Sequence, residues 1–286
     1  MKKINLAIFC SNLFLMLFCG LNLLAQQPPK TFIYRQIDAD TLKAYVFQPT
    51  TPGENHPAIL LFHGGGFKFG DASWCFDRAK EFAEKGIVSI CIDYRLANNG
   101  LTPIDGIEDA CAAFTWTRIH AKELRIDTKR VAGYGISAGG LLVACAAELQ
   151  SLRGNEIPGK SRPNVMLLYS PALNVVNEKP FDALMQGKGN SADYSPSEFV
   201  SSKLPPTLII QGEQDSITLA RYARTYRDAA MKVGARCILV VYPRVGHLLT
   251  RNVMHQENDF DPDPTDVADA YKREDDFLQS LGYIAK

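Results

Sequence analysis

Runs of apolar residues alternate with amphipathic segments along most of the chain. A continuous apolar run such as residues 57–62 is typical of a strand that is buried on both faces of a sheet. An amphipathic run such as residues 219–233 predicts a helix that covers the sheet. The other predicted strands are residues 87–92, 130–134, 165–169, 207–210 and 237–242, and the other predicted helices are residues 74–84, 103–120, 138–149 and 265–281. This alternation predicts an α/β protein with a mostly parallel central sheet and helices on both faces.

The beginning of the chain departs from this pattern. Residues 32–37 and 42–47 are strand-like runs separated by a short polar turn, which predicts an antiparallel hairpin. Before them, two lysines precede an apolar stretch that ends at Ala25, an arrangement typical of a secretory signal. We expect residues 1–25 to be a signal peptide cleaved after Ala25, which makes the protein secreted or periplasmic, and residues 26–286 to form a single domain.

Two alternatives to cleavage after Ala25 exist. A lipoprotein site at Cys19 requires a small residue before the cysteine, and Phe18 stands there instead. The apolar stretch could also stay uncleaved as an anchor. With cleavage after Ala25, we expect no stable insertion into a membrane.

Charge and cysteine content narrow the range of partners. The 31 basic and 31 acidic residues balance, and no basic stripe indicates a nucleic-acid partner. Five cysteines lie beyond the signal, and they are Cys75, Cys91, Cys111, Cys145 and Cys237. Their spread over regular elements favours buried single cysteines over a disulfide framework, and their spacing does not fit a metal site. We therefore expect neither structural disulfides nor zinc.

A serine stands at a sharp transition from strand to helix. The apolar run that ends at Tyr134 stops at Gly135-Ile-Ser137-Ala-Gly139, and a helix-forming run follows at once. A serine in this position projects from the end of the strand as a nucleophile elbow, and the glycines remove side chains that would collide there. Ala138 begins the helix, so its backbone N–H is free to bind an oxyanion.

A second glycine-rich turn follows residues 57–62. The sequence His63-Gly-Gly-Gly66 places unblocked N–H groups at the carboxyl end of a strand, where ligands bind in such sheets. We assign Gly65 and Gly66 as further oxyanion donors, because a tetrahedral intermediate needs two or three fixed donors. His63 precedes the nucleophile, and we expect it to hold the glycine loop by hydrogen bonding.

A nucleophilic serine needs a base, and the base needs an acidic partner that orients it. Asp215 follows the strand 207–210, and His247 follows the strand 237–242. Loops that leave neighbouring parallel strands meet at the same edge of the sheet, so both side chains can reach Ser137. The order serine, acid, histidine is the order known for nucleophile elbows of this type.

Other residues compete for these roles. Glu213 is the rival acid, but it lies closer to the end of its strand than Asp215. His255 is the rival base. A group of three aspartates, Asp259, Asp261 and Asp263, could suggest calcium. Prolines interrupt the group, so we interpret it as a solvated loop and a helix cap, without a metal.

Together these motifs resemble the α/β-hydrolase superfamily. More narrowly, they resemble the hormone-sensitive-lipase-like carboxylesterases and the related bacterial acetylxylan and feruloyl esterases. The motifs are His63-Gly-Gly-Gly-Phe67, Asp93-Tyr-Arg-Leu96, Gly135-Ile-Ser-Ala-Gly-Gly140, Gly212-Glu-Gln-Asp215 and Gly246-His247. The resemblance implies an α/β-hydrolase fold, Ser137 as nucleophile, His247 as base, Asp215 as its partner, and Gly65, Gly66 and Ala138 as the oxyanion hole.

Two features separate the chain from the hormone-sensitive-lipase group. That group usually carries an acidic residue before the serine, where this chain has Ile136, and it usually carries a large N-terminal helical cap. We expect no large cap here, and instead a small mobile cover formed by residues 174–203. Phe67, Trp74 and Leu248 flank the predicted loops, and we expect them to bind substrate.

These observations predict an exported serine carboxylesterase that acts on short acyl esters without a cofactor. Acetyl groups on plant polysaccharides or oligosaccharides such as xylan are the expected substrates. One alternative is a serine peptidase of the prolyl-oligopeptidase type, against which the glycine loop and the short chain count. The other is a binding member of the fold without catalytic activity.

Overall fold

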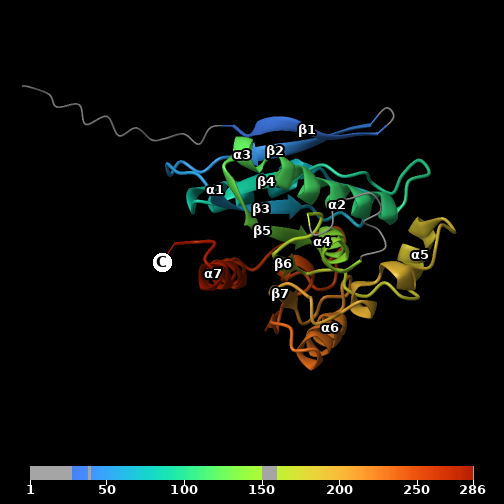
Figure 1. Cartoon of the computed structure of the whole chain (residues 1–286). Helices are drawn as coiled ribbons and strands as arrows, with labels where there is room; N and C mark the ends of the chain where they lie inside the picture. Colours follow the sequence, from blue (N-terminus) through green and yellow to red (C-terminus); the bar gives the residue numbers. More distant parts are fainter. Residues whose placement is uncertain (1–27, 38–39, 150–159, 286) are drawn as a thin grey trace, which may run out of the picture.

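Residues 28–37, 40–149 and 160–285 are described by a computed structural model, and they are organised around an eight-stranded sheet (Figure 1). The strand order is β1-β2-β4-β3-β5-β6-β7-β8. The strands are β1 (Lys30–Ile37), β2 (Asp40–Phe47), β3 (His56–Phe62), β4 (Val88–Ile92), β5 (Ile126–Ile136), β6 (Val165–Tyr169), β7 (Thr207–Gly212) and β8 (Cys237–Tyr242). β1 and β2 pair antiparallel, β2 pairs antiparallel with β4, and the remaining neighbours are parallel. The predicted hairpin and the mostly parallel sheet are thus confirmed.

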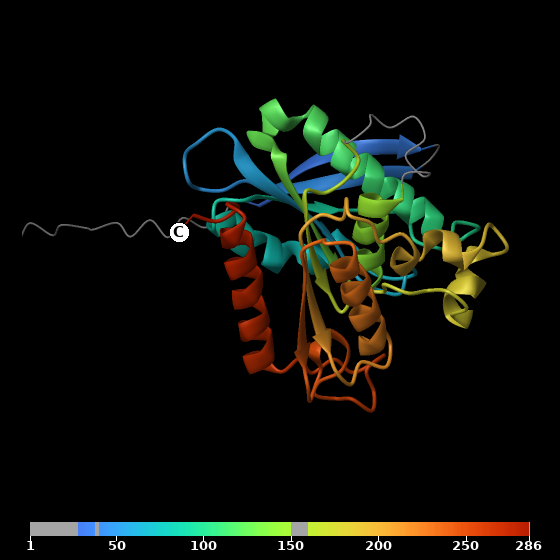
Figure 2. The ribbon, with the colours of Figure 1, turned by 60° about the horizontal axis from the view of Figure 1, so that its bottom comes forward.

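Helices cover both faces of the sheet. They are α1 (Phe76–Glu84), α2 (Pro103–Ile119), α3 (Ala121–Leu124), α4 (Ala138–Glu148), α5 (Lys179–Met185), α6 (Ala220–Lys232) and α7 (Pro264–Ser280). α2, α4 and α6 contribute to one apolar cluster, and α1 and α7 contribute to a second cluster on the opposite face. Figure 2 shows α7 on one side of the strands, with α4 and α6 on the other.

The residues of β3 explain why two clusters form. Successive side chains of a strand point to opposite faces. Leu60 and Phe62 therefore enter the cluster with α2 and α4, whereas Ile59 and Leu61 enter the cluster with α1 and α7. All four side chains are fully buried. A continuous apolar run is consequently what this position in the sheet requires.

The helix boundaries follow local chemistry. Asp263 accepts hydrogen bonds from the backbone N–H groups of Thr265 and Asp266 and so caps α7, and Pro264 takes the first helical position. Before α2, Thr102 and Asp105 form a capping box. The predicted helix over residues 74–84 is divided, because Ala72–Cys75 is a 3-10 helix that leads into α1. The predicted strand 130–134 is the central part of the longer β5.

The segment between β6 and β7 holds the predicted cover. It contains α5 and two 3-10 helices, Ser191–Tyr194 and Pro196–Glu198. Side chains of Gln186 and Lys188 donate to the carbonyls of Leu101 and Gly100, so the segment is tied to the loop before α2. It is small, as expected, and lies beside the end of α2 (Figure 1).

The predicted signal peptide lies outside the described residues. Among the residues that are described, no helix combines the length and the apolar character needed to cross a bilayer.

Candidate active site

Ser137 occupies a strained turn between β5 and α4. Its backbone has φ 53° and ψ −114°, a conformation that a residue with a side chain rarely adopts. The glycines on both sides allow this close packing. A Cβ atom on Gly135 would lie 2.5 Å from the Gly139 carbonyl oxygen, and one on Gly139 would lie 2.2 Å from the Phe62 carbonyl oxygen. The local sequence therefore forms the elbow because only glycine fits at these two positions.

Ser137, His247 and Asp215 form one hydrogen-bonded line. His247 Nε2 lies 3.0 Å from Ser137 Oγ, and His247 Nδ1 lies 2.8 Å from Asp215 Oδ2. All three side chains are buried. The acidic partner requires the proton on Nδ1, which leaves Nε2 as an acceptor facing the serine hydroxyl. This is the tautomer needed to remove a proton from the nucleophile.

Asp215 is held by its own loop. Its Oδ1 accepts the backbone N–H groups of Ile217 (2.9 Å) and Thr218 (2.7 Å), and its Oδ2 accepts Gln211 Nε2 (2.9 Å). These donors fix the position of the carboxylate. The rival acid Glu213 is exposed and pairs with Arg224 instead. Asp215 is therefore the carboxylate that reaches the histidine.

The glycine loop lies against Ser137. A Cβ atom on Gly64 would come within 3.2 Å of Ser137 Cβ. Gly66 and Ala138, two of the predicted oxyanion donors, line the same cavity as Ser137. Gly65 lies within the turn, where its carbonyl accepts the N–H groups of Lys68 and Phe69, and its φ of 111° suits glycine.

His63 supports this loop, as the sequence predicts. Its Nδ1 lies 2.6 Å from the Gly64 carbonyl, and its ring stacks on Tyr94 with centroids 4.4 Å apart. The Tyr94 hydroxyl donates to the His63 carbonyl at 2.9 Å. Burial lowers the pKa of His63, so the ring is neutral where it holds the loop. A neutral ring that donates to a carbonyl positions the loop, and it is His247 whose Nε2 lies within hydrogen-bonding distance of Ser137 Oγ.

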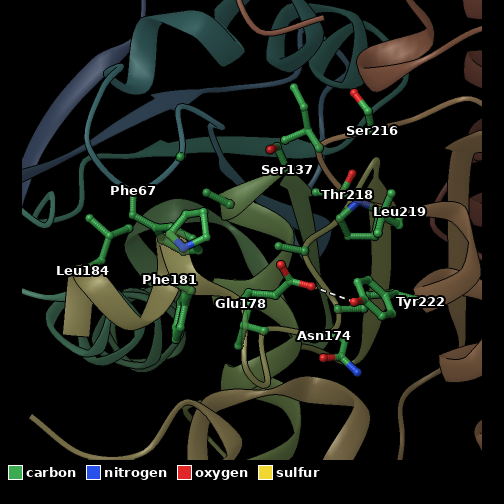
Figure 3. A pocket seen from close by; sticks show the side chains of 18 residues that line it. Phe67, Ser137, Asn174, Glu178, Phe181, Leu184, Ser216, Thr218, Leu219 and Tyr222 are labelled. Atoms are coloured by element: carbon green, nitrogen blue, oxygen red, sulfur yellow. Dashed lines mark hydrogen bonds between the residues drawn. The ribbon is translucent and has the colours of Figure 1, made fainter. Parts of the chain in front are cut away.

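A cavity of about 210 Å³ opens beside Ser137 (Figure 3). Phe67, Phe181 and Leu184 form an apolar part of its wall, and the rings of Phe67 and Phe181 meet at 5.6 Å. Of the three predicted substrate-binding residues, Phe67 lies in this wall. Trp74 lies outside the wall, because its ring packs edge-on against His63 and stays 59% exposed.

Leu248 also lies outside the cavity wall. It follows His247 in a left-handed conformation (φ 54°), and its N–H donates to Ser170 Oγ at 3.1 Å. Its contribution is therefore to the backbone of the histidine loop. His255, the rival base, is exposed, and His247 is the histidine that contacts Ser137.

The aspartates after His255 have partners of their own. Asp259 accepts from Asn252, Asp261 pairs with Arg251, and Asp263 caps α7. In the described part of the chain, histidine, cysteine and acidic side chains do not gather in groups of three or more that could hold a metal ion. Cys75, Cys91, Cys111, Cys145 and Cys237 are buried thiols.

Comparison with known proteins places this arrangement in a family. Residues 45–226, more than half of the chain, match the BD-FAE family. This chain belongs to the BD-FAE family. The matched region contains Ser137, Asp215 and the glycine loop, and His247 lies beyond it.

Individual relatives of this BD-FAE chain carry esterase names. It is 37% identical over 102 residues to the esterase LipI of Mycobacterium tuberculosis, which covers 35% of this chain and 32% of LipI. It is 24% identical over 246 residues to the isoprenylcysteine alpha-carbonyl methylesterase ICME of Arabidopsis thaliana, over 78% of this chain and 57% of the relative. The chain thus spans between a third and somewhat over half of these curated relatives.

A solved structure matches over a greater length. Esterase 2 of the planctomycete Thermogutta terrifontis superposes with a TM-score of 0.79 at 27% identity, over 90% of this chain and 94% of the other. The α/β-hydrolase fold expected from the motifs is therefore confirmed.

Three residues of this BD-FAE domain escaped the sequence analysis. The Thr218 hydroxyl lies 2.8 Å from Asp215 Oδ2, 2.9 Å from the Ser170 carbonyl and 3.1 Å from His247 Nδ1. Ser170 also accepts the N–H of Leu248. Gln256 bonds to both the acid loop and the histidine loop. Little in the sequence indicated them, because contacts such as those of Thr218 with the Ser170 carbonyl and of Gln256 with the Ser216 N–H join segments 48 and 40 residues apart.

Proposed function

We propose that this chain is a serine carboxylesterase that forms an acyl-enzyme on Ser137. The observation that carries the proposal is the hydrogen-bonded line from Asp215 through His247 to Ser137 at the edge of an apolar cavity. A nucleophile, a base in the correct tautomer and a fixed carboxylate are the parts that acyl transfer needs.

The geometry defines the steps. His247 Nε2 takes the proton of Ser137 as Oγ attacks the ester carbonyl, and the resulting oxyanion is bound by backbone N–H groups, for which Gly66 and Ala138 are the candidates. His247 then gives the proton to the leaving alcohol. Water enters with His247 as base, attacks the acyl-enzyme, and releases the carboxylic acid and free Ser137.

The acyl side of the ester fills the cavity in this proposal. The wall includes Ser137, Gly66 and Ala138 but not His247, which must reach the oxygen of the leaving alcohol. The alcohol therefore leaves on the side of His247, where the exposed Phe260 packs at 6.4 Å from the imidazole. An apolar cavity of about 210 Å³ suits short acyl chains.

The relatives support this substrate class. The esterase of Thermogutta terrifontis has been solved with propionate and with butyrate bound, and LipI carries the name esterase. For this chain we further propose export through the N-terminal signal, and acyl groups on plant polysaccharides or their fragments as substrates. In the described part of the chain the segment between β6 and β7 is small, which is compatible with a bulky carbohydrate on the alcohol side.

The first experiment measures initial rates on nitrophenyl acetate, butyrate and octanoate and on acetylated xylan. We expect the rates to fall from acetate or butyrate to octanoate, and we expect the protein to release acetate from xylan. In Ser137→Ala, all of these activities should fall to background. A Ser137→Ala protein with more than a few per cent of wild-type activity contradicts the assignment of the nucleophile.

A second experiment does not depend on the choice of ester. Paraoxon phosphorylates the Thermogutta esterase, and an activated serine here should react in the same way. We expect intact-mass spectrometry to show a single diethylphosphoryl adduct on the wild type and no adduct on Ser137→Ala. Absence of an adduct on the wild type would contradict an activated serine.

A further inference from the structure

A carboxylate interrupts the apolar wall of the cavity. Glu178 lies just before α5 and is half-buried, and Figure 3 shows its carboxylate projecting from the wall toward the interior. Phe67, Phe181 and Leu184 line the same space. A carboxylate among apolar side chains is costly to dehydrate, so any acyl group that covers Glu178 must replace its bound water.

One oxygen of Glu178 is already bound. The Tyr222 hydroxyl, on α6, donates to Glu178 Oε1 at 2.6 Å (Figure 3). The same hydroxyl accepts from Arg221 at 3.2 Å, so its single proton is directed to the carboxylate. Tyr222 therefore holds Glu178 in the cavity wall, and its hydrogen bond occupies Glu178 Oε1.

The other carboxylate oxygen of Glu178, Oε2, has no hydrogen-bond partner among the described residues. No donor or cation among the described residues lies within bonding distance of it, and no ion pair joins Glu178 to a described lysine or arginine. Glu213, in contrast, is paired with a cation, Arg224. Oε2 is thus an acceptor that the described protein leaves for a ligand.

We propose that Glu178 is a specificity-determining residue that selects acyl groups carrying a hydrogen-bond donor, either a hydroxyl or an ammonium group. A donor on the acyl chain satisfies Oε2, whereas a methyl group in the same place leaves a dehydrated carboxylate unpaired. A second carboxylate on the acyl chain is repelled. This inference rests on the proposed esterase function and adds the chemistry of the acyl group.

Matched methyl esters test this selection. The acyl groups differ only at the far end of the chain: butanoate, 3-hydroxypropanoate, 3-aminopropanoate and hydrogen malonate. The same series with one more carbon tests whether Glu178 lies further from Ser137 than the shorter chains reach. Acid release is followed in a pH-stat, and the readout is the ratio of kcat/KM between each ester and its methyl-ended counterpart.

We expect wild-type protein to prefer a donor-bearing ester by about 10-fold or more, the effect of a hydrogen bond to a charged group. Glu178→Gln should lower the ammonium preference and relieve the repulsion of the carboxylate ester, and Tyr222→Phe should weaken the preference by freeing Glu178. Glu198→Gln, on an exposed glutamate of the same segment, is the matched control with wild-type ratios. The ammonium and hydroxyl esters show which donor the site takes.

Binding separates failure of this inference from failure of the esterase proposal. Calorimetric titration of Ser137→Ala protein with the same esters needs no turnover, and tighter binding of the donor esters should disappear in Ser137→Ala/Glu178→Gln. Ser137-dependent hydrolysis with equal ratios in wild type and Glu178→Gln overturns the role of Glu178 and leaves the esterase intact. Donor-selective binding without hydrolysis of any ester overturns the esterase and retains the site.

Discussion

The side-chain oxygen of Gln256 accepts a hydrogen bond from the backbone N–H of His247 at 2.7 Å. The same oxygen accepts the N–H of Ser216 at 3.2 Å, and the amide nitrogen donates to the carbonyls of Gln214 and Val253, both at 2.8 Å. Gln256 is 3% exposed. One buried amide thus connects the loop of the acid to the loop of the base, with each of its four hydrogen-bonding positions occupied.

Loss of this amide should disturb the alignment of His247 with Ser137. We expect Gln256→Ala to lower kcat on a nitrophenyl ester by about 10- to 100-fold with KM changed less than about 3-fold, because small misplacement of a catalytic group costs that much. Gln214→Ala is the matched control, since its exposed side chain lies on the same loop. A fall in melting temperature with kcat unchanged would limit Gln256 to a structural role.

Gln256→Glu adds a pH test of the same contact. An ionised glutamate can accept the two N–H groups but places a negative oxygen against the carbonyls of Gln214 and Val253. We expect its activity relative to wild type to decline as the pH rises and the new carboxyl ionises. A constant ratio across pH 5 to 8 would mean that the carbonyl contacts are unimportant for catalysis.

The Thr218 hydroxyl contacts both Asp215 and His247 in the hydrogen-bonded line. Thr218→Val keeps the shape of the side chain and removes the hydroxyl that lies near Asp215 and Ser170. We expect about a 10-fold loss of kcat/KM, the range for a hydrogen bond to a charged group. Thr225→Val, at an exposed hydroxyl that donates to the Arg221 carbonyl, should retain wild-type kcat/KM. Equal effects of the two substitutions would contradict a role for Thr218 in the triad.

His63 should make stability depend on pH. Burial lowers the pKa of His63 below its usual value of 6.5. Above about pH 6.5 the ring is neutral in both states and the full stability is present. As the pH falls from there through the folded-state pKa, the unfolded chain binds a proton that the folded protein resists. The free energy of unfolding therefore decreases, by at most ~1.4 kcal/mol per pH unit from this group.

His63→Gln checks this prediction by urea unfolding between pH 4.5 and 8. The difference in unfolding free energy between wild type and the variant should be greatest above pH 6.5 and should shrink as the pH falls. His120→Gln, at a half-buried histidine between α2 and α3, serves as the comparison. A difference that is independent of pH would mean that His63 does not resist protonation in the fold.

The cavity wall offers a test of chain-length selection. Phe181 is buried and meets Phe67 edge to face. Phe181→Ala should enlarge the cavity and raise kcat/KM for nitrophenyl octanoate relative to acetate by several-fold, while the empty space costs about 3–5 kcal/mol of stability. Phe199→Ala, at a more exposed ring outside the wall, should leave the ratio unchanged. An unchanged ratio in Phe181→Ala would place the acyl chain elsewhere.

Local sequence determined much of this protein. The elbow at Ser137 requires glycine at positions 135 and 139, because a side chain at either would collide with the backbone. Both glycines lie within two residues of Ser137, so the motif could be identified directly from the sequence. The sheet followed in the same way, because a strand such as β3 buried on both faces must be apolar throughout. Asp215 and His247 could also be identified from the sequence, because loops that leave neighbouring parallel strands meet at one edge of the sheet.

Tertiary structure alone decided the remaining questions. The sequence favours Asp215 over Glu213 by position, but the contacts that hold Asp215, such as that with the Thr218 N–H, are visible only in the fold, where Glu213 pairs with Arg224. Trp74 was expected at the substrate, but the 3-10 helix before α1 turns its ring onto His63. Gln256 and the Glu178–Tyr222 pair join segments that are 9 to 44 residues apart. Such contacts depend on how whole loops pack, and no short-range pattern in the sequence encodes them.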